Sequence, residues 1–572
     1  MAYIGIDLGT STCEIAYYKD GKVELIPDLN GDIIIPSYIG VDQEGNFIYG
    51  RIAKNQFIAR RRYTTREFKR LMGTNTEISV GDKQYSPEEV SAMMLAYLKK
   101  SAEVYLNKKI DEVIVTVPAN FDDNQRSATM RAIQMSGLRC ERIINEPTAA
   151  SMTYGLDNID EESTILVFDF GGGTLDITIL EMFDGILDVK ASHGDTQLGG
   201  KDFDERMKGI IIEKLRTKGI AVSEQDDELM AKIYAMAEDA KIGLSNERKV
   251  SVQLENVRIS NELQDIEIQI TRDEFEAKIE DLMKRAENLV VEAIKAAEME
   301  IGDIHNVILV GGTTKVPIVK QRISKLLNKI LRTDVEPDTA VAKGAAIQIA
   351  IKSGLIDSKS GLLVTDVCPY SLGTETAEIV DVFLIDGLYH EMIKRNTTIP
   401  CERTDEFVPL SPEQEIVSVK VYQTLNENCK LVKDAKLIGE FTLDLVPNLP
   451  VQENAIELTY SYDINGTLKV SARHLKTQVV KEITIDKSKI LSGDGKKETS
   501  KEKLQTSRLY SKYSSTIENV ERKMGMIQDP KLIKELDSNL EMLKQHIINE
   551  NEDLAEAMES KVLDLLMGND LL

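Results

Sequence analysis

The chain has 572 residues, 42% of them hydrophobic, so it is long and apolar enough to form several domains with their own cores. Its 70 basic residues are outnumbered by 95 acidic ones, and the formal net charge of −25 argues against nonspecific binding to nucleic acid or to an acidic membrane. The five cysteines lack a CxxC pair or a histidine at ligand spacing, and no secretory signal or membrane-length apolar run occurs, so we expect a reduced cytoplasmic protein without a zinc site.

The first motif is a strand–turn–strand pattern at residues 3–17, YIGIDLGTSTCEIAY. An apolar strand ends at Asp7, and Gly9 with the hydroxyl residues Thr10 and Ser11 precedes a second strand. A turn built from such small residues lets backbone N–H groups approach an anion closely. A single turn of this kind is more often an ordinary β-turn, so its meaning depends on the rest of the chain.

Three further features belong to the first lobe. Lys69 carries a mobile positive charge that is able to reach a phosphate. From the sequence alone, a lysine at this position is more often a solvent-exposed residue on a helix. Ser86 opens a capping box with proline at the first helical position, which predicts a helix through about Leu106. Glu146 begins another predicted helix, where an acidic residue commonly serves as a cap.

A second copy of the strand–turn–strand pattern lies at residues 166–178, LVFDFGGGTLDIT. Its first strand carries Asp169, its second strand carries Asp176, and the turn between them consists of Gly171, Gly172, Gly173 and Thr174. Two copies predict a duplicated α/β core with two phosphate clamps that face each other across a cleft. Asp7 and Asp169 are then expected to hold one hydrated Mg²⁺.

The second lobe is predicted to run from about Glu162 to Gly354. Alternating residues between 250 and 270 predict two antiparallel strands, and a capping box at Thr271 predicts one long helix to about Met299. A polar, glycine-containing stretch at 353–360 predicts a linker.

The pattern changes after this linker. The apolar segment at 362–366, LLVTD, is expected to dock on another surface because an exposed apolar patch needs a partner. Short strands from 367 to 486 predict a β-sandwich, and Asn465-Gly466 predicts one of its hairpins. After Asp529, apolar residues recur at helical spacing and predict a short helical bundle: Leu532, Ile533, Leu536, Leu540, Leu543 and Ile547.

Four longer motifs identify a family resemblance: NEPTAA at 145–150, GDTQLGGKDFD at 194–204, LVGGTTKVP at 309–317 and EPDTAVAKGAA at 336–346. Together with the two hairpins they resemble the actin-like ATPases and, more narrowly, the DnaK-type chaperones of the heat-shock protein 70 family. The resemblance covers nearly the whole chain up to about Ser488. The motifs CPYSLG and SYDING and the short C-terminal region are most similar to the HscC-like branch.

This resemblance implies a multidomain fold. We expect an α/β actin-like ATPase domain with a duplicated ribonuclease H-like core at 1–354, an interdomain linker at 355–366, an all-β sandwich that binds peptides at 367–490, and a short α-helical lid at 491–572. The implied activity is that of an ATP-dependent chaperone, in which slow ATP hydrolysis switches the affinity for extended apolar segments of unfolded proteins.

The resemblance also assigns roles within the first domain, with ATP or ADP and Mg²⁺ as cofactors and K⁺ as a further cation. Catalytic roles fall on Lys69, Glu146, Asp169, Thr174 and Asp176. Phosphate contacts fall on Gly9, Thr10, Ser11, Gly171, Gly172, Gly173 and Thr174. Contacts to the nucleoside fall on Glu238, Lys241, Ser245, Gly311, Gly312 and Asp338. From the sequence alone, Glu238 and Lys241 share a helix face, so the alternative to nucleoside binding is that they form an ion pair on the surface.

In the β-sandwich the resemblance places Val417 at the centre of the peptide pocket, with Phe407 and Val419 beside it. Read from the pattern alone, these are inward-facing core residues. The arch that covers the peptide in the family falls on Thr374 and Ala377, which are both small, so we expect altered and looser selectivity.

The implied partners are unfolded or extended apolar polypeptides, a J-domain co-chaperone and a nucleotide-exchange factor, with no nucleic acid and no membrane, and the chain is expected to be mainly monomeric. Two other functions compete with this interpretation. A sugar kinase of the same superfamily would use the same clamps, but the β-rich region after residue 367 argues against it. A regulatory or exchange-factor relative would bind nucleotide with little peptide cycling, and the small arch and short lid leave room for it.

Overall fold

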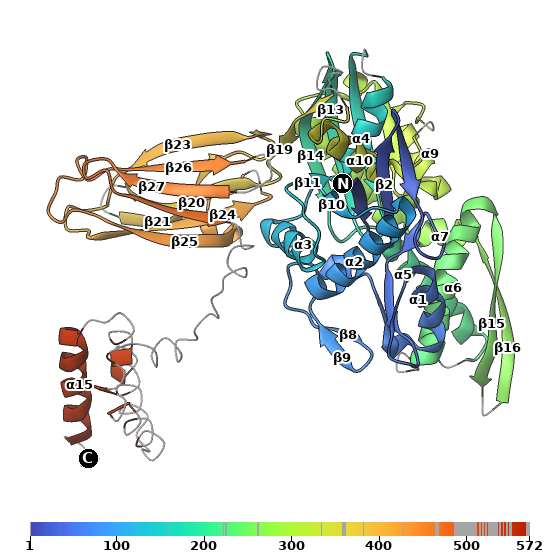
Figure 1. The fold of residues 1–572 in the computed structure, drawn as a ribbon, viewed down its shortest axis with the longest axis horizontal. Helices are drawn as coiled ribbons and strands as arrows, with labels where there is room; N and C mark the ends of the chain where they lie inside the picture. Colours follow the sequence, from blue (N-terminus) through green and yellow to red (C-terminus); the bar gives the residue numbers. More distant parts are fainter. Residues whose placement is uncertain are drawn as a thin grey trace. The chain divides into compact units, whose positions relative to one another are not determined.

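The computed structural model describes residues 2–485, except 159–160, 221, 224–225, 260–261, 333–334, 357–361, 381–382, 427 and 464–467. Beyond residue 485 it describes 552–567 and scattered positions between 509 and 547. The chain divides into two compact units, Met1–Ser488 and Lys489–Leu572 (Figure 1). The predicted hairpin turn at Asn465-Gly466 and the predicted helix start at Asp529 lie outside the described residues.

The first lobe is built on a mixed sheet in the order β11-β10-β1-β2-β3, with β4 paired to β2. β1 runs parallel to β10 and antiparallel to β2, so the predicted first hairpin is confirmed. The strands of this sheet are β1 (Ala2–Leu8), β2 (Thr12–Lys19), β3 (Lys22–Ile26), β4 (Ile35–Pro36), β10 (Ile110–Val117) and β11 (Ile143–Asn145).

Helices and two small sheets complete the first lobe. α2 begins at Ser86 with the predicted capping box and ends at Leu106, as expected. The helices are α1 (Gly50–Ala59), α2 (Pro87–Leu106), α3 (Asp123–Met135) and α4 (Glu146–Asp157). The small sheets contain β5 (Tyr38–Val41), β6 (Phe47–Tyr49) and β7 (Thr64–Arg66), and β8 (Ile78–Val80) and β9 (Lys83–Tyr85).

The second lobe repeats the arrangement of the first. Its sheet has the order β17-β12-β13-β14-β18, in which β12 runs parallel to β17 and antiparallel to β13, just as β1 does between β10 and β2. The predicted duplication is therefore confirmed at the level of strand order and direction. The strands are β12 (Ser163–Phe170), β13 (Leu175–Phe183), β14 (Ile186–Asp195), β17 (Asn306–Val310) and β18 (Leu363–Val364).

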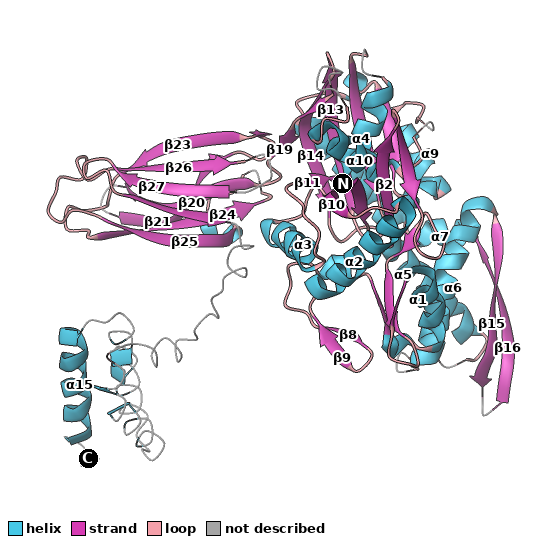
Figure 2. Ribbon diagram, viewed as in Figure 1, coloured by secondary structure: helices cyan, strands magenta, loops and turns pink. Residues whose placement is uncertain are grey.

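The helix at 280–296 packs on β13 and β14 of this sheet, whereas the helix at 340–352 packs on β1, β2 and β10 of the first sheet. An antiparallel pair of strands extends from the lobe (Figure 2). The helix predicted from Thr271 to Met299 is wrong as a single element, because it is interrupted at Ile279 and divides into α7 and α8. The helices are α5 (Gly200–Thr217), α6 (Asp227–Asn246), α7 (Arg272–Lys278), α8 (Glu280–Ala296), α9 (Pro317–Leu327) and α10 (Ala340–Lys352), and the extending pair is β15 (Lys249–Ile259) and β16 (Glu262–Thr271).

The region after residue 366 forms the predicted β-sandwich. Two four-stranded sheets, β21-β20-β24-β25 and β23-β26-β27-β28, enclose one hydrophobic cluster that includes Val421, Leu458 and Tyr460. The strands are β19 (Asp366–Val367), β20 (Ser371–Val380), β21 (Phe383–Ile393), β22 (Thr398–Ile399), β23 (Cys401–Phe407), β24 (Ile416–Thr424), β25 (Lys436–Asp444), β26 (Ile456–Tyr462), β27 (Leu468–His474) and β28 (Val480–Ile485).

The second unit contains α15 (Glu552–Met567) and a hydrophobic cluster of its own. Leu536, Leu540, Leu543 and Ile547 are all buried in that cluster, as their helical spacing predicts. No helix among the described residues is both long enough and apolar enough to cross a membrane.

Candidate functional site

The turns of the two hairpins lie against each other. A Cβ added at Gly172 would lie 2.0 Å from Ser11 Oγ, and one added at Gly173 would lie 2.5 Å from Thr10 Oγ1. Only glycine therefore fits at these two positions while the turns stay this close. The two predicted clamps face each other, as expected.

The two turns form one wall of a cavity of about 340 Å³, which we call the cleft. This volume lies within the range of small-molecule sites. Of the predicted nucleotide and metal residues, Asp176 and Ser245 do not line the cleft: Asp176 is buried beside it, and Ser245 Oγ donates to the carbonyl of Lys241. The predicted residues that do line it are Asp7, Gly9, Thr10, Ser11, Lys69, Glu146, Asp169, Gly171, Gly172, Gly173, Thr174, Glu238, Lys241, Gly311, Gly312 and Asp338.

Five acids lie at one end of the cleft, and we call them the acidic cluster: Glu14, Glu146, Asp169 and Asp176 are buried, and Asp7 is partly buried. Burial, with a contribution from Glu146, raises the pKa of Asp7 to about 7. Burial also raises the pKa of Asp176 to about 7. The pKa of Asp169 is raised well above its usual range by burial and, in addition, by the nearby carboxylates of Glu146, Asp176 and Asp7. The cluster therefore needs a positive charge to stay ionised near neutral pH.

Lys69 supplies one such charge. Its side chain is only 4% exposed, and its ammonium group donates to Glu146 Oε1, so the reading as a solvated lysine is wrong. Burial lowers the pKa of Lys69, but Glu146 and Asp7 outweigh that effect and raise it. Lys69 is thus held charged at the centre of the acidic cluster.

The cluster also fits a hydrated divalent cation. Oδ2 of Asp169 and Oδ2 of Asp176 are buried without a hydrogen-bond partner, which a cation with its water shell would satisfy. Among the described residues, no three His, Cys, Asp or Glu side chains converge into a direct metal cage.

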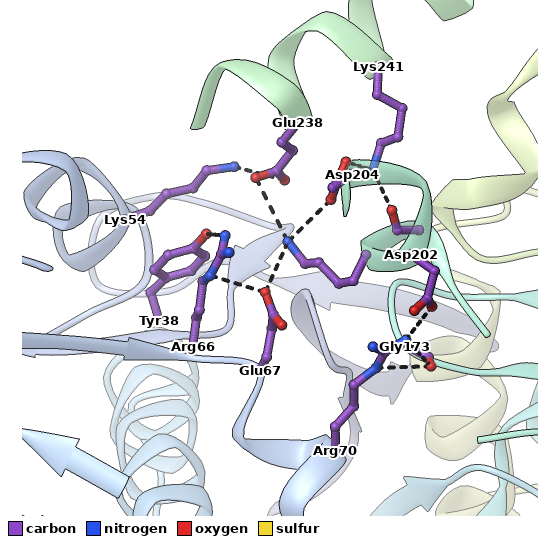
Figure 3. A network of polar contacts seen from close by, with 12 residues as sticks. Tyr38, Lys54, Arg66, Glu67, Arg70, Gly173, Asp202, Asp204, Glu238 and Lys241 are labelled. Carbon is purple, nitrogen blue, oxygen red and sulfur yellow. Dashed lines mark hydrogen bonds and ion pairs between the residues drawn. The ribbon is translucent and has the colours of Figure 1, made fainter. Parts of the chain in front are cut away.

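The other end of the cleft is a network of ion pairs that joins the two lobes (Figure 3). Lys54 on α1 donates to Glu238 on α6 at 3.2 Å, and Lys241 pairs with Asp204 at 2.7 Å. Burial alone would raise the pKa of Glu238, but Lys201, Lys54 and Lys241 together lower it to about 2. Glu238 therefore pairs with Lys54 of the other lobe and Lys241 pairs with Asp204 of its own lobe, so they do not form the surface ion pair that their spacing alone suggests.

Two residues of this network were missed from the sequence. Arg70 donates to the carbonyl of Gly173 at 3.1 and 2.7 Å and to Asp202 at 2.7 Å, so a first-lobe side chain holds the second turn (Figure 3). Lys201 is buried between Glu67 and Asp204, at 3.7 Å from each. Their signals were available, since Arg70 follows Lys69 and Lys201 lies inside the motif GDTQLGGKDFD.

A chain of hydrogen bonds leads from the acidic cluster to the β-sandwich. Asn120 Nδ2 donates to Asp176 Oδ1 at 2.7 Å, and the Asn120 carbonyl accepts from Tyr370 Oη at 2.7 Å. Arg395, which precedes β22, donates to the carbonyl of Ser192 on β14 at 3.0 Å. The β-sandwich therefore contacts both lobes close to the buried acids.

The segment between the two domains is bound as a strand. β18 extends the second-lobe sheet by pairing with Ile186 and Leu187 of β14. Thr365 donates to Asp188 Oδ1 at 2.5 Å and accepts from the Val189 N–H at 3.2 Å. These contacts hold the segment against β14 of the second lobe.

Asp366 fastens the end of this segment to the first lobe. Asn145 Nδ2 donates to both of its carboxylate oxygens, at 2.9 and 2.8 Å. Burial raises the pKa of Asp366, and nearby Arg126 and Arg142 oppose that rise. Asn145 ends β11 and immediately precedes Glu146 of the acidic cluster. The end of β11 therefore contacts the interdomain segment through Asn145 and the cleft through Glu146.

A second cavity of about 290 Å³ lies in the β-sandwich, and we call it the groove. All five predicted peptide-contact residues line it: Thr374, Ala377, Phe407, Val417 and Val419. The sequence pattern alone predicts that these residues lie in a closed core. In the structure they line a groove, which opens between two strands, β20 and β24, and the segment that follows β23. Val408 and Leu410 on that segment are 52% and 46% exposed, which gives the groove an apolar rim.

Leu410 was missed as a groove residue. It is a large side chain on the segment after β23, whereas the predicted arch residues Thr374 and Ala377 belong to β20. Glu375 and Asp386 add two carboxylates to the lining, and Glu375 accepts from Lys420 at 2.9 Å. Lys420 lines the groove as well, so the groove combines apolar walls with a margin of mixed charge.

Comparisons with known proteins cover nearly the whole chain. A family model described as Hsp70 protein matches residues 3–81 and 74–567. A chaperone protein DnaK of Mycoplasma mobile is 37% identical over 490 residues, which are 86% of this chain and 79% of that protein. A chaperone protein DnaK of Thermotoga neapolitana is 36% identical over 560 residues, which are 97% of this chain and 87% of that protein. The matched ranges include both the cleft and the groove.

Proposed function

The chain belongs to the Hsp70 family and is an ATP-dependent chaperone with ATPase activity, and on this basis we propose how its cleft and groove work together. The cleft binds and slowly hydrolyses ATP, and the bound nucleotide sets the affinity of the groove for extended apolar segments of unfolded proteins. In this proposal the ATPase domain spans residues 1–354, the linker 355–366, the peptide-binding domain 367–490 and a helical lid 491–572.

The phosphates lie between the two hairpin turns. Backbone N–H groups and hydroxyls of both turns surround them, because no side chain fills the space at the glycines. The contributing residues are Gly9, Thr10, Ser11, Gly171, Gly172, Gly173 and Thr174. The nucleoside lies toward the ion-pair network and contacts Glu238, Lys241, Gly311, Gly312 and Asp338, whereas Ser245 lies outside the cleft and supports the helix of Lys241.

Mg²⁺, and K⁺ beside it, would neutralise phosphate charge from the water-mediated positions offered by Asp7 and Asp169. The protein's own part is positioning. Lys69 lies within the acidic cluster and stabilises the charge on the transferred phosphoryl group. Glu146, Thr174 and Asp176 orient the attacking water. A site that works by positioning alone is expected to turn over slowly.

The arrangement with β18 paired to β14 corresponds to the ATP-bound form in this proposal. Its support is the set of contacts that join linker and sandwich to the ATPase lobes, of which Asn145–Asp366 and Asn120–Tyr370 are the clearest. ATP shifts the equilibrium toward this form only to the extent that it binds this form more tightly than the undocked form. Hydrolysis then releases the sandwich and closes the groove on its peptide.

The groove takes one apolar side chain of an extended peptide beside Val417. Phe407, Val419, Thr374 and Ala377 form its walls. A J-domain protein would stimulate hydrolysis and an exchange factor would speed nucleotide release. A cytoplasmic location agrees with the five free cysteines, since thiols persist in a reducing compartment.

One observation carries the proposal: two turns that contain glycine, each preceded by an aspartate that lines the cleft, meet at a single cavity. The test is the ATPase rate of the full chain, measured alone, with a J-domain protein and with an apolar peptide. We expect both additions to raise a low basal rate. A rate that neither addition changes would contradict the coupled cycle and would leave a nucleotide-binding regulatory relative as the better description.

A further inference from the structure

The two hairpins share more than their turns. Asp7 on β1 lies directly opposite Glu14 on β2, and Asp169 on β12 lies directly opposite Asp176 on β13. In both hairpins the second acid follows the first by seven residues. Residues directly opposite in an antiparallel pair project from the same face. Each hairpin therefore presents two acids side by side, and Glu14 is the counterpart of Asp176.

Glu14 is fully inside the protein and faces the cleft. It is 1% exposed and lines the cleft together with Asp7 and Asp338. No hydrogen-bond partner among the described residues reaches its Oε1. A buried carboxyl oxygen without a partner is costly, so its presence in a well-packed strand calls for a group that the protein alone does not supply.

The charge balance indicates the nature of that group. The acidic cluster places five carboxyl groups around Lys69, whose ammonium is already paired with Glu146. Glu14 lies directly opposite Asp7 in the first hairpin, and both line the cleft, so two carboxyl groups meet at this point. A nucleotide would bring further negative charge to the same end of the cleft. Additional positive charge would let these carboxyl groups stay ionised beside one another and beside the phosphates.

We propose that Glu14 is a further carboxylate of the cation site, which accepts hydrogen bonds from the water shell of the cation beside Asp7. This inference rests on the proposed nucleotide function of the cleft. Contact through water agrees with the absence of a three-carboxylate cage among the described residues. Oxygen ligands held through water suit a hard divalent cation of the Mg²⁺ and Mn²⁺ class.

Binding of Mn²⁺ to the full-length chain tests this assignment. Free Mn²⁺ is measured by electron paramagnetic resonance in the presence of saturating ADP, for wild type, Glu14→Gln and the control Cys13→Ala. Cys13 precedes Glu14 on β2 and projects from the opposite face, where its Sγ lies 3.2 Å from Ser37 Oγ. We expect Glu14→Gln to weaken Mn²⁺ binding by at least about tenfold and Cys13→Ala to stay within about twofold of wild type.

Thermal unfolding separates this role from a structural one. Without metal and nucleotide, Glu14→Gln removes an unsatisfied buried acid, so its unfolding midpoint should equal or exceed that of wild type. The rise in midpoint on adding Mn²⁺ and ADP should be smaller in the variant. A midpoint lowered equally with and without these ligands would show that Glu14 serves packing only and would overturn the proposal.

The outcomes also distinguish this inference from the function on which it rests. If wild type binds ADP and Mn²⁺ while Glu14→Gln binds Mn²⁺ as tightly or more tightly, the role of Glu14 is refuted and the nucleotide site stands. If wild type binds neither ADP nor Mn²⁺, the proposed nucleotide function itself is refuted, together with the role of Glu14.

Discussion

Asn120 donates a 2.7 Å hydrogen bond from its side-chain amide to Oδ1 of Asp176, a buried acid of the cluster at the cleft. The carbonyl of the same residue accepts a 2.7 Å hydrogen bond from Tyr370 Oη, immediately before the first long strand of the β-sandwich. A change in the position of Asp176 is thereby able to reach the peptide-binding domain through one residue. This route is a physical candidate for coupling between nucleotide and peptide.

The Tyr370 hydroxyl provides the first prediction. Tyr370→Phe removes one hydrogen bond from the docked arrangement, which is worth about 1 kcal/mol or about fivefold in an equilibrium. The ATP-induced loss of peptide affinity should therefore shrink by about fivefold, while peptide affinity with ADP stays unchanged. Fluorescence anisotropy with a labelled apolar peptide measures both values.

The matched control for this prediction is Tyr389→Phe. Tyr389 Oη lies 3.0 Å from Ser371 Oγ inside the sandwich, so the control also loses a buried hydroxyl but keeps the contact with Asn120. Equal effects of the two substitutions would mean that sandwich stability, and not the contact between domains, sets the response to ATP.

The second prediction concerns the contact between the two turns. In Gly172→Ala the new Cβ would lie 2.0 Å from Ser11 Oγ, so the turns must separate and the phosphate clamp must widen. We expect the affinity for ATP, measured by isothermal titration calorimetry, to fall by at least about tenfold. Gly209→Ala in α5 is the control, because nothing lies within 4 Å of its added Cβ, and it should keep the wild-type affinity.

The third prediction is a pH dependence of stability without metal and nucleotide. The pKa of Asp7 and of Asp176 is raised to about 7, so between about pH 4 and pH 7 the folded state keeps protons that the unfolded state has lost. The stability that these protons contribute is lost as pH rises toward and through 7. His193, whose pKa is lowered to about 4 by burial and by Arg395, acts in the opposite direction as a single group.

Urea denaturation in the presence of a chelator measures this effect. The free energy of unfolding should decrease by on the order of 2 kcal/mol between about pH 5.5 and pH 7.5. Mg²⁺ with ADP should restore more stability at the upper end of this pH range, where the acids must ionise. Asp176→Asn should reduce the dependence of the free energy of unfolding on pH. A stability that increases over the range would contradict the assigned pKa directions.

The fourth prediction concerns the groove. Val417→Phe adds bulk at the centre of a cavity of about 290 Å³, so an apolar peptide side chain no longer fits. Peptide affinity should fall by at least about tenfold, while ATP affinity stays at the wild-type value. The control Val480→Phe adds the same bulk at an exposed position on β28 and should leave both affinities unchanged.

Much of this arrangement follows from local sequence. The hairpins were predictable because an apolar strand, a small-residue turn and a second strand occur twice at the same spacing, and α2 was predictable from its capping box at Ser86. Glu14 was missed although a signal existed, since it follows Asp7 by the seven residues that separate Asp169 from Asp176.

Contacts between distant segments could not be predicted in the same way. Nothing local to Asn120 shows that it meets Asp176 on one side and Tyr370 on the other, because that contact depends on how three segments pack. The break at Ile279 was missed because the apolar spacing continues from α7 into α8 and hides the irregular residue between them. Periodicity reports which face is buried and does not report where a helix bends.

The most direct test of the account is the rate at which a bound peptide leaves the full-length chain. A fluorescent apolar peptide is bound in the presence of ADP, and its dissociation is followed by stopped flow after mixing with ATP or with further ADP. We predict that ATP accelerates dissociation by at least about tenfold. Equal dissociation rates in a protein that hydrolyses ATP would contradict coupling between the cleft and the groove.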